Sequence, residues 1–449
     1  MQQNTVAAPA LAAEGQRKVE WVRRNMPILR QLGSAVRRGA AVRRQAHRHL
    51  DSPRGEDRLS RARAARGRRC RVRRGQQPGV DEGRRRRGAR GRRACTSTRA
   101  TAPRPDEMRR YMGFALEIGP HVVIDDGGDL VELLHESHRK FGKDMLGACE
   151  ETTSGVLRAR ARANARQLEF PVVLVNDARC KYLFDNVHGT GQSVWEGVMR
   201  STNLVLAGKT VVIVGYGWCG KGCALRAQGL GAHVVVCEVD PVKAADALMH
   251  GCRVLPLAEA CRVADVVLTV TGVRHTLRAE HFPLLKSNVL LANAGHFWEE
   301  IDVAALAKLA VERKELRANV EGFRLADGRW LNLLGGGNIV NIACGDGHPA
   351  EIMDMSFALQ ALAARHVVMS AGSLAADCHP VPTAIDEQVA RLKLAAAGVA
   401  IDTLTSDQQQ YLRTLASLTP RQRGALRARS LVVVRARGTR RPSSSCRSG

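Results

Sequence analysis

The sequence predicts an α/β fold: two doubly wound, Rossmann-like domains followed by a helical C-terminal tail. A β-branched run, a glycine-rich turn and a helical stretch follow one another over 211–229, as in a dinucleotide-binding unit. Short apolar runs at 171–175, 265–271 and 288–292 end in small or polar residues, which is typical of buried parallel strands. With 449 residues, 45% of them apolar, the chain is long enough for two or three domains with sizeable cores.

The N-terminus and the cysteines indicate a cytoplasmic protein. The first 21 residues carry no basic start before their short Ala-rich stretch, so no signal peptide is expected. No apolar run is long enough to span a membrane. The 12 cysteines include no C-x-x-C pair and no His-flanked cluster, so we expect reduced thiols rather than a disulfide framework or a metal site.

The net charge of +26 is concentrated in two segments. Residues 33–104 hold 24 Arg, no Lys and 5 acidic residues, and residues 420–449 hold 9 Arg without a Lys or an acid. The remaining body is nearly neutral, so nucleic acid is not expected as its partner. The first segment also lacks Phe, Tyr, Trp, Ile and Met and shows no periodicity, so we expect it to be disordered.

Three interpretations of the Arg-rich segment stay open. The run at 83–93 is a candidate RNA-binding tract, and the whole segment is also compatible with a disordered basic insert. The third interpretation is a translation artefact, because Ala codons in GC-rich DNA give Arg codons when they are read out of frame. It accounts for Arg without Lys in both basic segments and for the abrupt return of patterned sequence near Pro105.

Gly215, Gly217 and Gly220 form the spacing G-x-G-x-x-G between a predicted strand and a predicted helix. They permit a tight turn, the approach of a pyrophosphate and close helix–strand packing, respectively. Glu238 ends the next predicted strand, where a carboxylate binds the ribose of NAD and repels the 2′-phosphate of NADP. The alternative is a glycine-rich turn in an unrelated α/β fold. The expected ligand crevice, at the carboxyl ends of the strands, is lined by Thr271, Gly272, Asn293, Gly295 and His296.

Four further polar stretches adjoin apolar runs and are expected to form loops at strand ends, where sites tend to lie: 124–130, 150–155, 175–186 and 341–349. Lys181 and Asp185 would share one face of a helix, either as an exposed ion pair or as a desolvated pair that trades protons with a substrate hydroxyl. His296 and His348 lie beside glycines in predicted loops. They are interpreted either as solvated loop residues or as acid–base groups of the site.

Together these stretches resemble the S-adenosylhomocysteine hydrolase family, in its bacterial and archaeal branch. The resemblance covers residues 20–29 and about 106–411, and several of the matching strings are specific to the family. They are EWVRRNMPIL, IDDGGDL, EETTSGV, FPVVLVNDA, KYLFDN, GTGQS, LAGKTVVIVGYGWCGKG, EVDP, TVTG, NAGHF, GHPAEIMDMSFALQAL and ARLKL.

The resemblance implies a homotetrameric enzyme that binds one NAD tightly per subunit, with a cleft between two domains. The implied parts are a substrate-binding domain at 1–188, an NAD-binding domain at 189–347, a return to the substrate domain at 348–375, a C-terminal tail at 376–411 and an aberrant basic tail at 412–449.

The resemblance also implies residue roles. Catalysis is implied for Asp126, Glu151, Lys181, Asp185 and His296. Substrate binding is implied for Asp126, Glu151, Lys181, Asp185 and His348. Cofactor binding is implied for Thr152, Thr153, Ser154, Asn186, Gly215, Gly217, Gly220, Glu238, Asn293, His296 and Asn341.

The implied reaction is the reversible hydrolysis of S-adenosyl-L-homocysteine to adenosine and L-homocysteine, a step of the activated methyl cycle. The cofactor oxidises the ribose 3′-hydroxyl to a ketone, which acidifies the neighbouring 4′ C–H. Loss of that proton expels homocysteine, water adds, and the stored hydride returns. Domain closure would keep bulk water away from the intermediate.

Two parts of the chain depart from the family. After residues 26–29 the family has a His-x-Thr pair and a Ser-Asn-Pro-Leu-Ser-Thr-like stretch, and the Arg-rich segment replaces both at nearly preserved length. Two compensating frameshifts would give this result. Beyond Tyr411 the Lys and Tyr that reach a neighbouring subunit's cofactor are also missing. We therefore expect the chain to be inactive, or nearly so, as a hydrolase.

Two alternative functions stay open at this point. The first is a related enzyme that prefers S-inosylhomocysteine, because base-contacting residues fall partly in the replaced segment. The second comes from another class: a non-catalytic, basic nucleic-acid-binding protein that keeps the NAD-binding fold as a scaffold.

Overall fold

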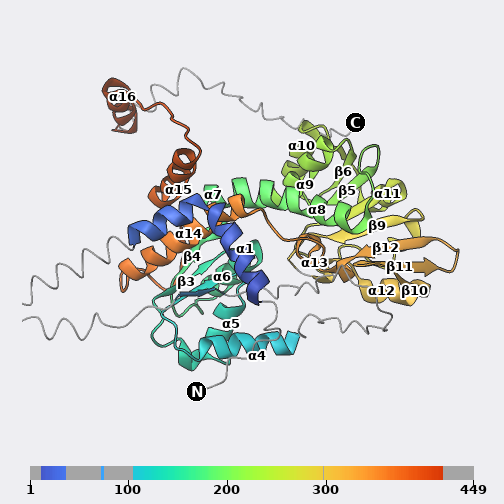
Figure 1. Cartoon of the computed structure of the whole chain (residues 1–449), viewed down its shortest axis with the longest axis horizontal. Coiled ribbons are helices and arrows are strands. Elements are labelled where there is room, and N and C mark those ends of the chain that lie inside the picture. Colours follow the sequence, from blue (N-terminus) through green and yellow to red (C-terminus); the bar gives the residue numbers. More distant parts are fainter. Residues whose placement is uncertain (1–11, 37–71, 75–104, 297, 418–449) are drawn as a thin grey trace, which may run out of the picture. The chain divides into compact units, whose positions relative to one another are not determined.

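Two β-sheets with helices on both faces make up most of the described protein. The computed structural model, drawn in Figure 1, describes residues 12–36, 72–74, 105–296 and 298–417. The chain divides into two compact units, residues 1–397 and residues 398–449. The first unit contains both sheets, so the predicted doubly wound α/β class is confirmed. Among the described helices, none is long and apolar enough to cross a membrane.

Five parallel strands form the smaller sheet, in the order β1-β2-β3-β4-β13. They are β1 (Val72–Arg74), β2 (Val122–Asp125), β3 (Gly147–Glu150), β4 (Val172–Leu174) and β13 (Cys378–Pro380). One face is covered by α4 (Pro105–Leu116), α5 (Asp129–His135) and α6 (Thr153–Asn164). The other face is covered by α14 (Ala350–Met369) and α15 (Thr383–Ala396).

Eight strands form the larger sheet, in the order β10-β11-β12-β9-β8-β5-β6-β7. They are β5 (Thr210–Val214), β6 (His233–Cys237), β7 (Arg253–Val254), β8 (Val266–Thr269), β9 (Val289–Asn293), β10 (Ala310–Arg317), β11 (Val320–Leu325) and β12 (Trp330–Leu334). All pairings are parallel except those of β11 with β10 and β12. The predicted strands at the glycine-rich turn and at 265–271 and 288–292 are therefore confirmed.

Helices cover both faces of this larger sheet. One apolar core includes side chains of α8 (Thr190–Thr202), α9 (Trp218–Gly229), α10 (Pro241–Met249) and α13 (Val340–Ala343). The core on the other face includes side chains of α11 (Leu257–Val263), α12 (Val303–Leu309) and the 3-10 turn η5 (Phe282–Leu284). The remaining 3-10 turns are η2 (Arg139–Phe141), η3 (Val175–Asp177), η6 (Trp298–Glu300) and η7 (Gly335–Gly337).

A continuous helical segment leads from the small sheet to the large one. It begins as α7 (Arg179–Lys181), continues as the π-helix η4 (Tyr182–Gly189) and runs into α8. A π-helix has i→i+5 hydrogen bonds and is common at functional sites. The chain returns to the small sheet through α13 and α14.

The second described helix is anchored on α14. The first helix among the described residues is α1 (Ala12–Arg24), and residues 27–36 form a second helix. The Asp354 carboxylate of α14 accepts hydrogen bonds from the backbone N–H groups of Ile28 at 2.8 Å and Leu29 at 2.9 Å. These two N–H groups lie in the first turn of the second helix, where no intrahelical acceptor exists, so the carboxylate caps it.

Some expectations for the unusual segments differ from the structure. Most of 33–104 lies outside the described residues, but 33–36 are helical and 72–74 form β1, so the expected disorder does not hold for these two pieces. β1 pairs with the edge of β2, whose backbone groups need partners. The predicted helical tail includes the strand β13, and α16 (Ser406–Ser417) contains the described part of 412–449.

Candidate functional site

Four predicted site residues meet where the small sheet joins the π-helix. The Lys181 ammonium lies 2.8 Å from Asp185 Oδ1 and donates to Asn186 Oδ1 at 2.9 Å. Its Nζ also lies 3.4 Å from Glu151 Oε1, an ion pair without hydrogen-bond geometry. All four residues are buried. Glu151 directly follows β3, and the other three residues belong to α7 and η4.

The π-helix explains why two consecutive residues contact the same ammonium. Asp185 and Asn186 are the fourth and fifth residues after Lys181, and the wider turn of η4 brings both to Nζ. The predicted shared face of Lys181 and Asp185 is therefore confirmed. Their side chains are only 7% and 3% exposed, which excludes the alternative of an ordinary exposed ion pair.

The three ionisable side chains of the cluster differ in the direction in which their surroundings shift their pKa. Burial alone would lower the pKa of Lys181, but the carboxylates of Asp185 and Glu151 outweigh it and raise that pKa. Burial would raise the pKa of Asp185, but Lys181 and His348 hold it below its ordinary value. Burial raises the pKa of Glu151 to about 7, although the charge of Lys181 opposes the rise. Near neutral pH, Glu151 is therefore the member of this cluster that gains or loses a proton.

Helix α14 and His348, two residues before it, complete the cluster. His348 Nδ1 lies 3.2 Å from Asp185 Oδ1. Ser356 Oγ donates to Asp185 Oδ2 at 2.7 Å, and Gln360 Nε2 donates to Glu151 Oε2. Sequence reasoning identified His348 but missed Ser356 and Gln360. Their spacing of four residues on a predicted helix, inside a family-specific string, was the available signal.

Asp126 and His296 lie at another edge of this site. Asp126 follows β2, and its charge acts on both Glu151 and His296. Burial lowers the pKa of His296, and the charge of Asp126 opposes that effect. The imidazole lies against Gly127, where a Cβ would come within 2.8 Å of its Nε2. Gly127 also has φ of 114°, so a glycine is required for this approach.

The glycine-rich turn has the geometry predicted for a dinucleotide cradle. Gly215 has φ of 102°, and a Cβ at Gly220 would lie 2.0 Å from the Gly215 carbonyl oxygen. A Cβ at Gly217 would meet no atom of the described residues within 4 Å, so the space in front of it is open. Gly217 is also the N-cap of α9 and offers no side-chain cap, which leaves first-turn N–H groups for an anion.

Glu238 is fixed beside this turn by backbone amides. Its Oε2 accepts from the Tyr216 N–H at 2.7 Å, and its Oε1 accepts from the N–H groups of Val239 at 2.7 Å and Asp240 at 3.0 Å. Partial burial would raise the pKa of Glu238, but these hydrogen bonds lower it below its ordinary value. A charged acceptor therefore stands at the end of β6.

Two contacts join the acid–base cluster to the glycine-rich turn. Thr190 Oγ1 lies 3.2 Å from His348 Nε2 and 3.5 Å from Cys219 Sγ, in the first turn of α9. The rings of Tyr182 and Trp218 stack with their centroids 4.6 Å apart. Tyr182 directly follows Lys181 in the chain, so the catalytic candidate and the cradle are held in one arrangement.

Three predicted cofactor residues form the start of α6. Thr152 is the N-cap, and its Oγ1 accepts from the Gly155 N–H at 3.2 Å. Ser154 Oγ lies 3.2 Å from the same hydroxyl, and Thr153 Oγ1 accepts from Asn176 Nδ2 at 3.2 Å. Their hydroxyls are thus engaged with one another and with neighbouring polar groups at this helix end.

Two of the three predicted cofactor asparagines, Asn341 and Asn293, differ in their surroundings. Asn341 Nδ2 donates to Ser193 Oγ at 3.1 Å, whereas its buried Oδ1 has no hydrogen-bond partner among the described residues. Asn293 is fully buried. Its Oδ1 accepts from the Gly295 N–H at 2.8 Å, and its Nδ2 donates to the Gly337 carbonyl at 3.1 Å, so it ties the loops of the crevice together.

Glu300 is a buried carboxyl of the crevice that sequence reasoning missed. It accepts from the N–H groups of Thr271 at 2.9 Å and Gly272 at 2.6 Å. A Cβ at Gly295 would lie 1.5 Å from Glu300 Oε1, so the loop after β9 packs directly on this carboxyl. The loops predicted to line the crevice therefore meet around one acidic residue.

Comparison with known proteins agrees with this geometry. Residues 186–347 match the family model described as S-adenosyl-L-homocysteine hydrolase, NAD binding domain. An adenosylhomocysteinase of Thermosynechococcus vestitus is 48% identical over 69% of this chain and 72% of its own length. Those of Thermococcus kodakarensis and Pyrococcus abyssi are 48% and 50% identical, over 72% and 69% of this chain and 77% and 73% of their own lengths.

The matches to these three relatives extend over more than two thirds of this chain and of each relative's own length. The chain therefore belongs to the S-adenosyl-L-homocysteine hydrolase family.

Proposed function

We propose that the chain is built as an adenosylhomocysteinase, which hydrolyses S-adenosyl-L-homocysteine reversibly to adenosine and L-homocysteine. One observation carries the proposal: a buried Lys–Asp–Glu cluster is linked through His348, Thr190 and the Tyr182–Trp218 ring stack to the glycine-rich turn of a dinucleotide-binding sheet. Ordinary hydrolysis has no use for a dinucleotide. A reaction that borrows a hydride from its substrate needs proton-transfer groups beside one.

The residues present fit NAD. Gly217 leaves open space at the uncapped end of α9 for a pyrophosphate, Glu238 offers a charged acceptor to ribose hydroxyls, and Asn341 Oδ1 is a buried acceptor with no described partner. When bound, NAD supplies the removal and return of a hydride at the ribose 3′ carbon. We assign contacts with it to Thr152, Thr153, Ser154, Asn186, Gly215, Gly217, Gly220, Glu238, Asn293, His296 and Asn341.

The acid–base work falls to the buried cluster. Lys181 Nζ holds its proton between Asp185 and Glu151, and we place the substrate hydroxyl that exchanges a proton beside this ammonium. Glu151, with a pKa of about 7 and its Oε1 not hydrogen-bonded, accepts or returns a proton near neutral pH. We assign catalysis to Asp126, Glu151, Lys181, Asp185 and His296, and substrate binding to Asp126, Glu151, Lys181, Asp185 and His348.

The wider setting is part of the same proposal. We place the substrate-binding domain at 1–188 and 348–375, the NAD-binding domain at 189–347, and the reaction in the cytoplasm as a step of the activated methyl cycle. The nine described cysteines are free thiols, which supports a reducing compartment. We also propose a homotetramer, supported by apolar side chains such as Tyr411 and Leu412 that the second unit leaves exposed.

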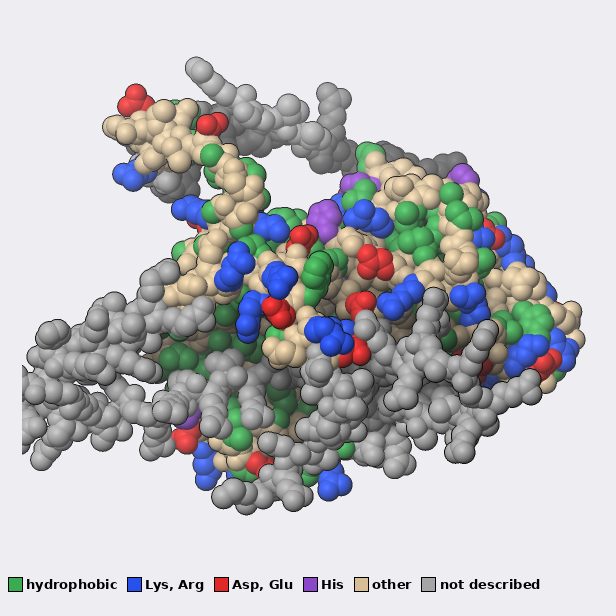
Figure 2. Space-filling model, in the orientation of Figure 1, with side chains coloured by type: hydrophobic (Ala, Val, Ile, Leu, Met, Phe, Trp, Pro, Cys, Tyr) green, Lys and Arg blue, Asp and Glu red, His purple; other side chains and the backbone are tan. Residues whose placement is uncertain are grey.

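Neither alternative function is favoured. The relatives are named for the adenosyl reaction. On the face drawn in Figure 2, Lys and Arg side chains of the described residues are interspersed with Asp and Glu rather than gathered into one basic surface. Binding of RNA that weakens steeply with salt would support the nucleic-acid alternative.

The function is tested on a repaired chain, in which residues 33–104 and 412–449 are replaced by the corresponding stretches of the Pyrococcus abyssi relative. We expect this protein to release adenosine and homocysteine from S-adenosyl-L-homocysteine, measured by chromatography, and to prefer that substrate to S-inosylhomocysteine in direct competition. No adenosine release by a folded, NAD-loaded repaired chain would contradict the proposal, and preference for the inosyl compound would select the alternative enzyme.

Replacing Glu238 by Gln is expected to weaken NAD retention by about 10-fold or more, because hydrogen bonds to a charged group contribute more than neutral ones. The amide also repels one of the backbone N–H groups that now fix the carboxylate. NAD that stays with the protein on gel filtration is the measurement. Asp240→Asn, two residues further on, is the matched control, because the partly exposed Asp240 side chain caps α10 and an asparagine can keep that cap. Equal retention by Glu238→Gln and the parent would contradict the role of Glu238.

A further inference from the structure

Asp125 and Glu150 are buried acids that lie side by side and are used nowhere in the proposed reaction. They are register partners at the ends of β2 and β3, and they are 2% and 1% exposed. Strand alternation sets them on the face covered by α5 and α6, because Val123 and Ala148, two residues earlier, belong to that core. Glu151 is one residue further on and reaches Gln360 of α14, on the opposite face.

Glu150 ties two turns together with a single oxygen. Its Oε1 accepts from the Gly127 N–H at 3.0 Å, in the turn that carries Asp126. The same oxygen accepts from the N–H and the hydroxyl of Thr152, each at 2.8 Å, directly after Glu151. The peptides that carry two of the proposed catalytic carboxyls are thus held by one side chain.

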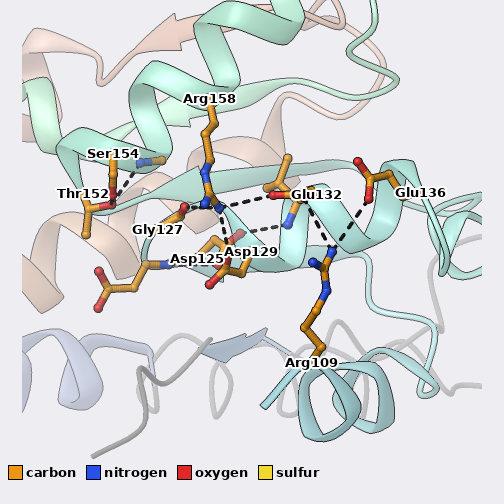
Figure 3. A network of polar contacts seen from close by, with 12 residues as sticks. Arg109, Asp125, Gly127, Asp129, Glu132, Glu136, Thr152, Ser154 and Arg158 are labelled. Atoms are coloured by element: carbon orange, nitrogen blue, oxygen red, sulfur yellow. Dashed lines mark hydrogen bonds and ion pairs between the residues drawn. The ribbon is translucent and has the colours of Figure 1, made fainter. Parts of the chain in front are cut away.

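Asp125 holds the same turn from its other end. Its Oδ1 accepts from the Asp126 N–H at 3.0 Å, and its Oδ2 accepts from the Val131 N–H at 2.8 Å, in the first turn of α5. Figure 3 shows this carboxyl beside the Gly127 backbone and Arg158. Arg158 donates to the Gly127 carbonyl at 3.1 Å, so both the backbone N–H and the carbonyl of Gly127 are hydrogen-bonded.

The second carboxyl oxygen of Glu150, Oε2, lies in surroundings that favour the protonated form of this carboxyl. Its Oε2 is buried without a hydrogen-bond partner among the described residues. α6 packs directly above it, because a Cβ at Gly155 would lie 2.1 Å from the Glu150 carboxyl carbon. Two adjacent carboxyls without a cation between them cannot both stay ionised in such a site. Burial raises the pKa of Asp125 to about 7 and that of Glu150 well above its ordinary value.

We propose that Glu150 is a positioning residue that shares one proton with Asp125, and that the singly protonated pair clamps the turn carrying Asp126 to the turn after Glu151. The inference deepens the proposed function and rests on it for the roles of those two carboxyls. The charged groups that face the pair are Asp126 and Asp129 from the turn and α5, and Arg158 from α6. The partner of Glu150 in β4 is the uncharged Leu174.

Hydrogen–deuterium exchange of the full chain tests the clamp without any need for turnover. Glu150→Ala is expected to lower protection of residues 125–131 and 150–156 by about 10-fold or more, because the amide donors lose a buried acceptor. Glu150→Gln keeps an acceptor oxygen and carries a permanent N–H in place of the shared proton, so protection stays within about two-fold of the parent near neutral pH. Gly155→Ala pushes the carboxyl aside and should reproduce the Ala variant.

The pH dependence separates a shared proton from a merely structural contact. Because the folded protein raises the pKa of Asp125, the stability that the protonated pair provides is lost as pH rises through about 7. Protection of both turns should therefore fall in the parent from about pH 4, the ordinary range of a carboxyl, to about pH 7, and it should fall less steeply in Glu150→Gln, which keeps only the buried Asp125 carboxyl. Glu136→Gln, which alters a carboxyl paired with Arg162 at 2.9 Å, is the matched control.

Three outcomes would overturn the proposal: full protection in Glu150→Ala, equal loss in Glu150→Gln and Glu150→Ala, or the same pH profile in Glu150→Gln and the parent. Unchanged protection of β4 and α14 in every variant shows that the five-stranded sheet is still folded. The result is independent of catalysis. A clamp without adenosine release by the repaired chain would remove the proposed function alone, and hydrolysis without a clamp would remove only this inference.

Discussion

Turnover of S-adenosyl-L-homocysteine by the repaired chain is expected to fall by on the order of 100-fold or more when Lys181 is replaced by Met, while NAD stays bound. Methionine keeps most of the side-chain volume and removes the amine that carries the proton. The loss also changes Glu151, because the charge of Lys181 now lowers the pKa of that carboxyl. Without this charge the pKa of Glu151 rises above about 7, and less of it is ionised at neutral pH.

Stability must be separated from catalysis in this experiment. Removing Lys181 leaves the buried carboxylate of Asp185 without its closest cation, and breaking a buried ion pair costs about 3–5 kcal/mol. Lys181→Arg provides the separation, because a guanidinium restores positive charge but does not release a proton in proteins. We expect the Arg variant to unfold at a higher temperature than the Met variant and still to turn over slowly.

Lys308 offers the matched control for this substitution, because it is an exposed lysine of α12 on the other side of the cofactor sheet. Lys308→Met should turn over like the repaired chain. Near-normal turnover by Lys181→Met, with bound NAD and an intact fold, would make Lys181 a structural ion-pair partner and return the acid–base role to Glu151 and its neighbours.

The features that sequence reasoning predicted correctly are local in the chain. The glycine-rich turn is encoded within six residues, and its strand, helix and following Glu238 lie within one βαβ unit. The Lys181–Asp185 pair follows from helical spacing alone. Even so, spacing did not distinguish an α-helix from the π-helix η4, so the contact of Asn186 with Lys181 was not expected.

The features that were missed depend on long-range packing. Ser356 and Gln360 are 171 and 209 residues away in the chain from the carboxyls they contact, and only the fold of α14 across the small sheet brings them there. The shared position of Asp125 and Glu150 needs the register of β2 and β3. The strand β13 was also missed, because three residues are too few for a periodic signal and it is defined by its pairing with β4.

The unrepaired chain itself is expected to give a divided result: bound NAD but no adenosine release. The reason is the origin of its apolar cores. Every buried residue of the two cores beside the eight-stranded sheet lies between Val194 and Cys344, so this part needs nothing from the aberrant segments. One core of the five-stranded sheet draws on residues from Ile28 to Val389, on both sides of the Arg-rich segment.

Limited trypsin digestion with mass spectrometry, together with an adenosine assay, measures both halves of this expectation. Trypsin cleaves after arginine, and residues 33–104 contain 24 Arg, so this segment should be cut first. A fragment of about 189–347 should survive the digestion and retain NAD. Assembly of the proposed tetramer should also suffer, because the resemblance implies tail residues beyond Tyr411 that this sequence does not contain, and native mass spectrometry should show smaller species than for the repaired chain. The repaired chain, digested and assayed in parallel, is the control. Rapid hydrolysis of S-adenosyl-L-homocysteine by the unrepaired polypeptide would overturn both the frameshift interpretation and the view that the replaced segment supplies part of the substrate site.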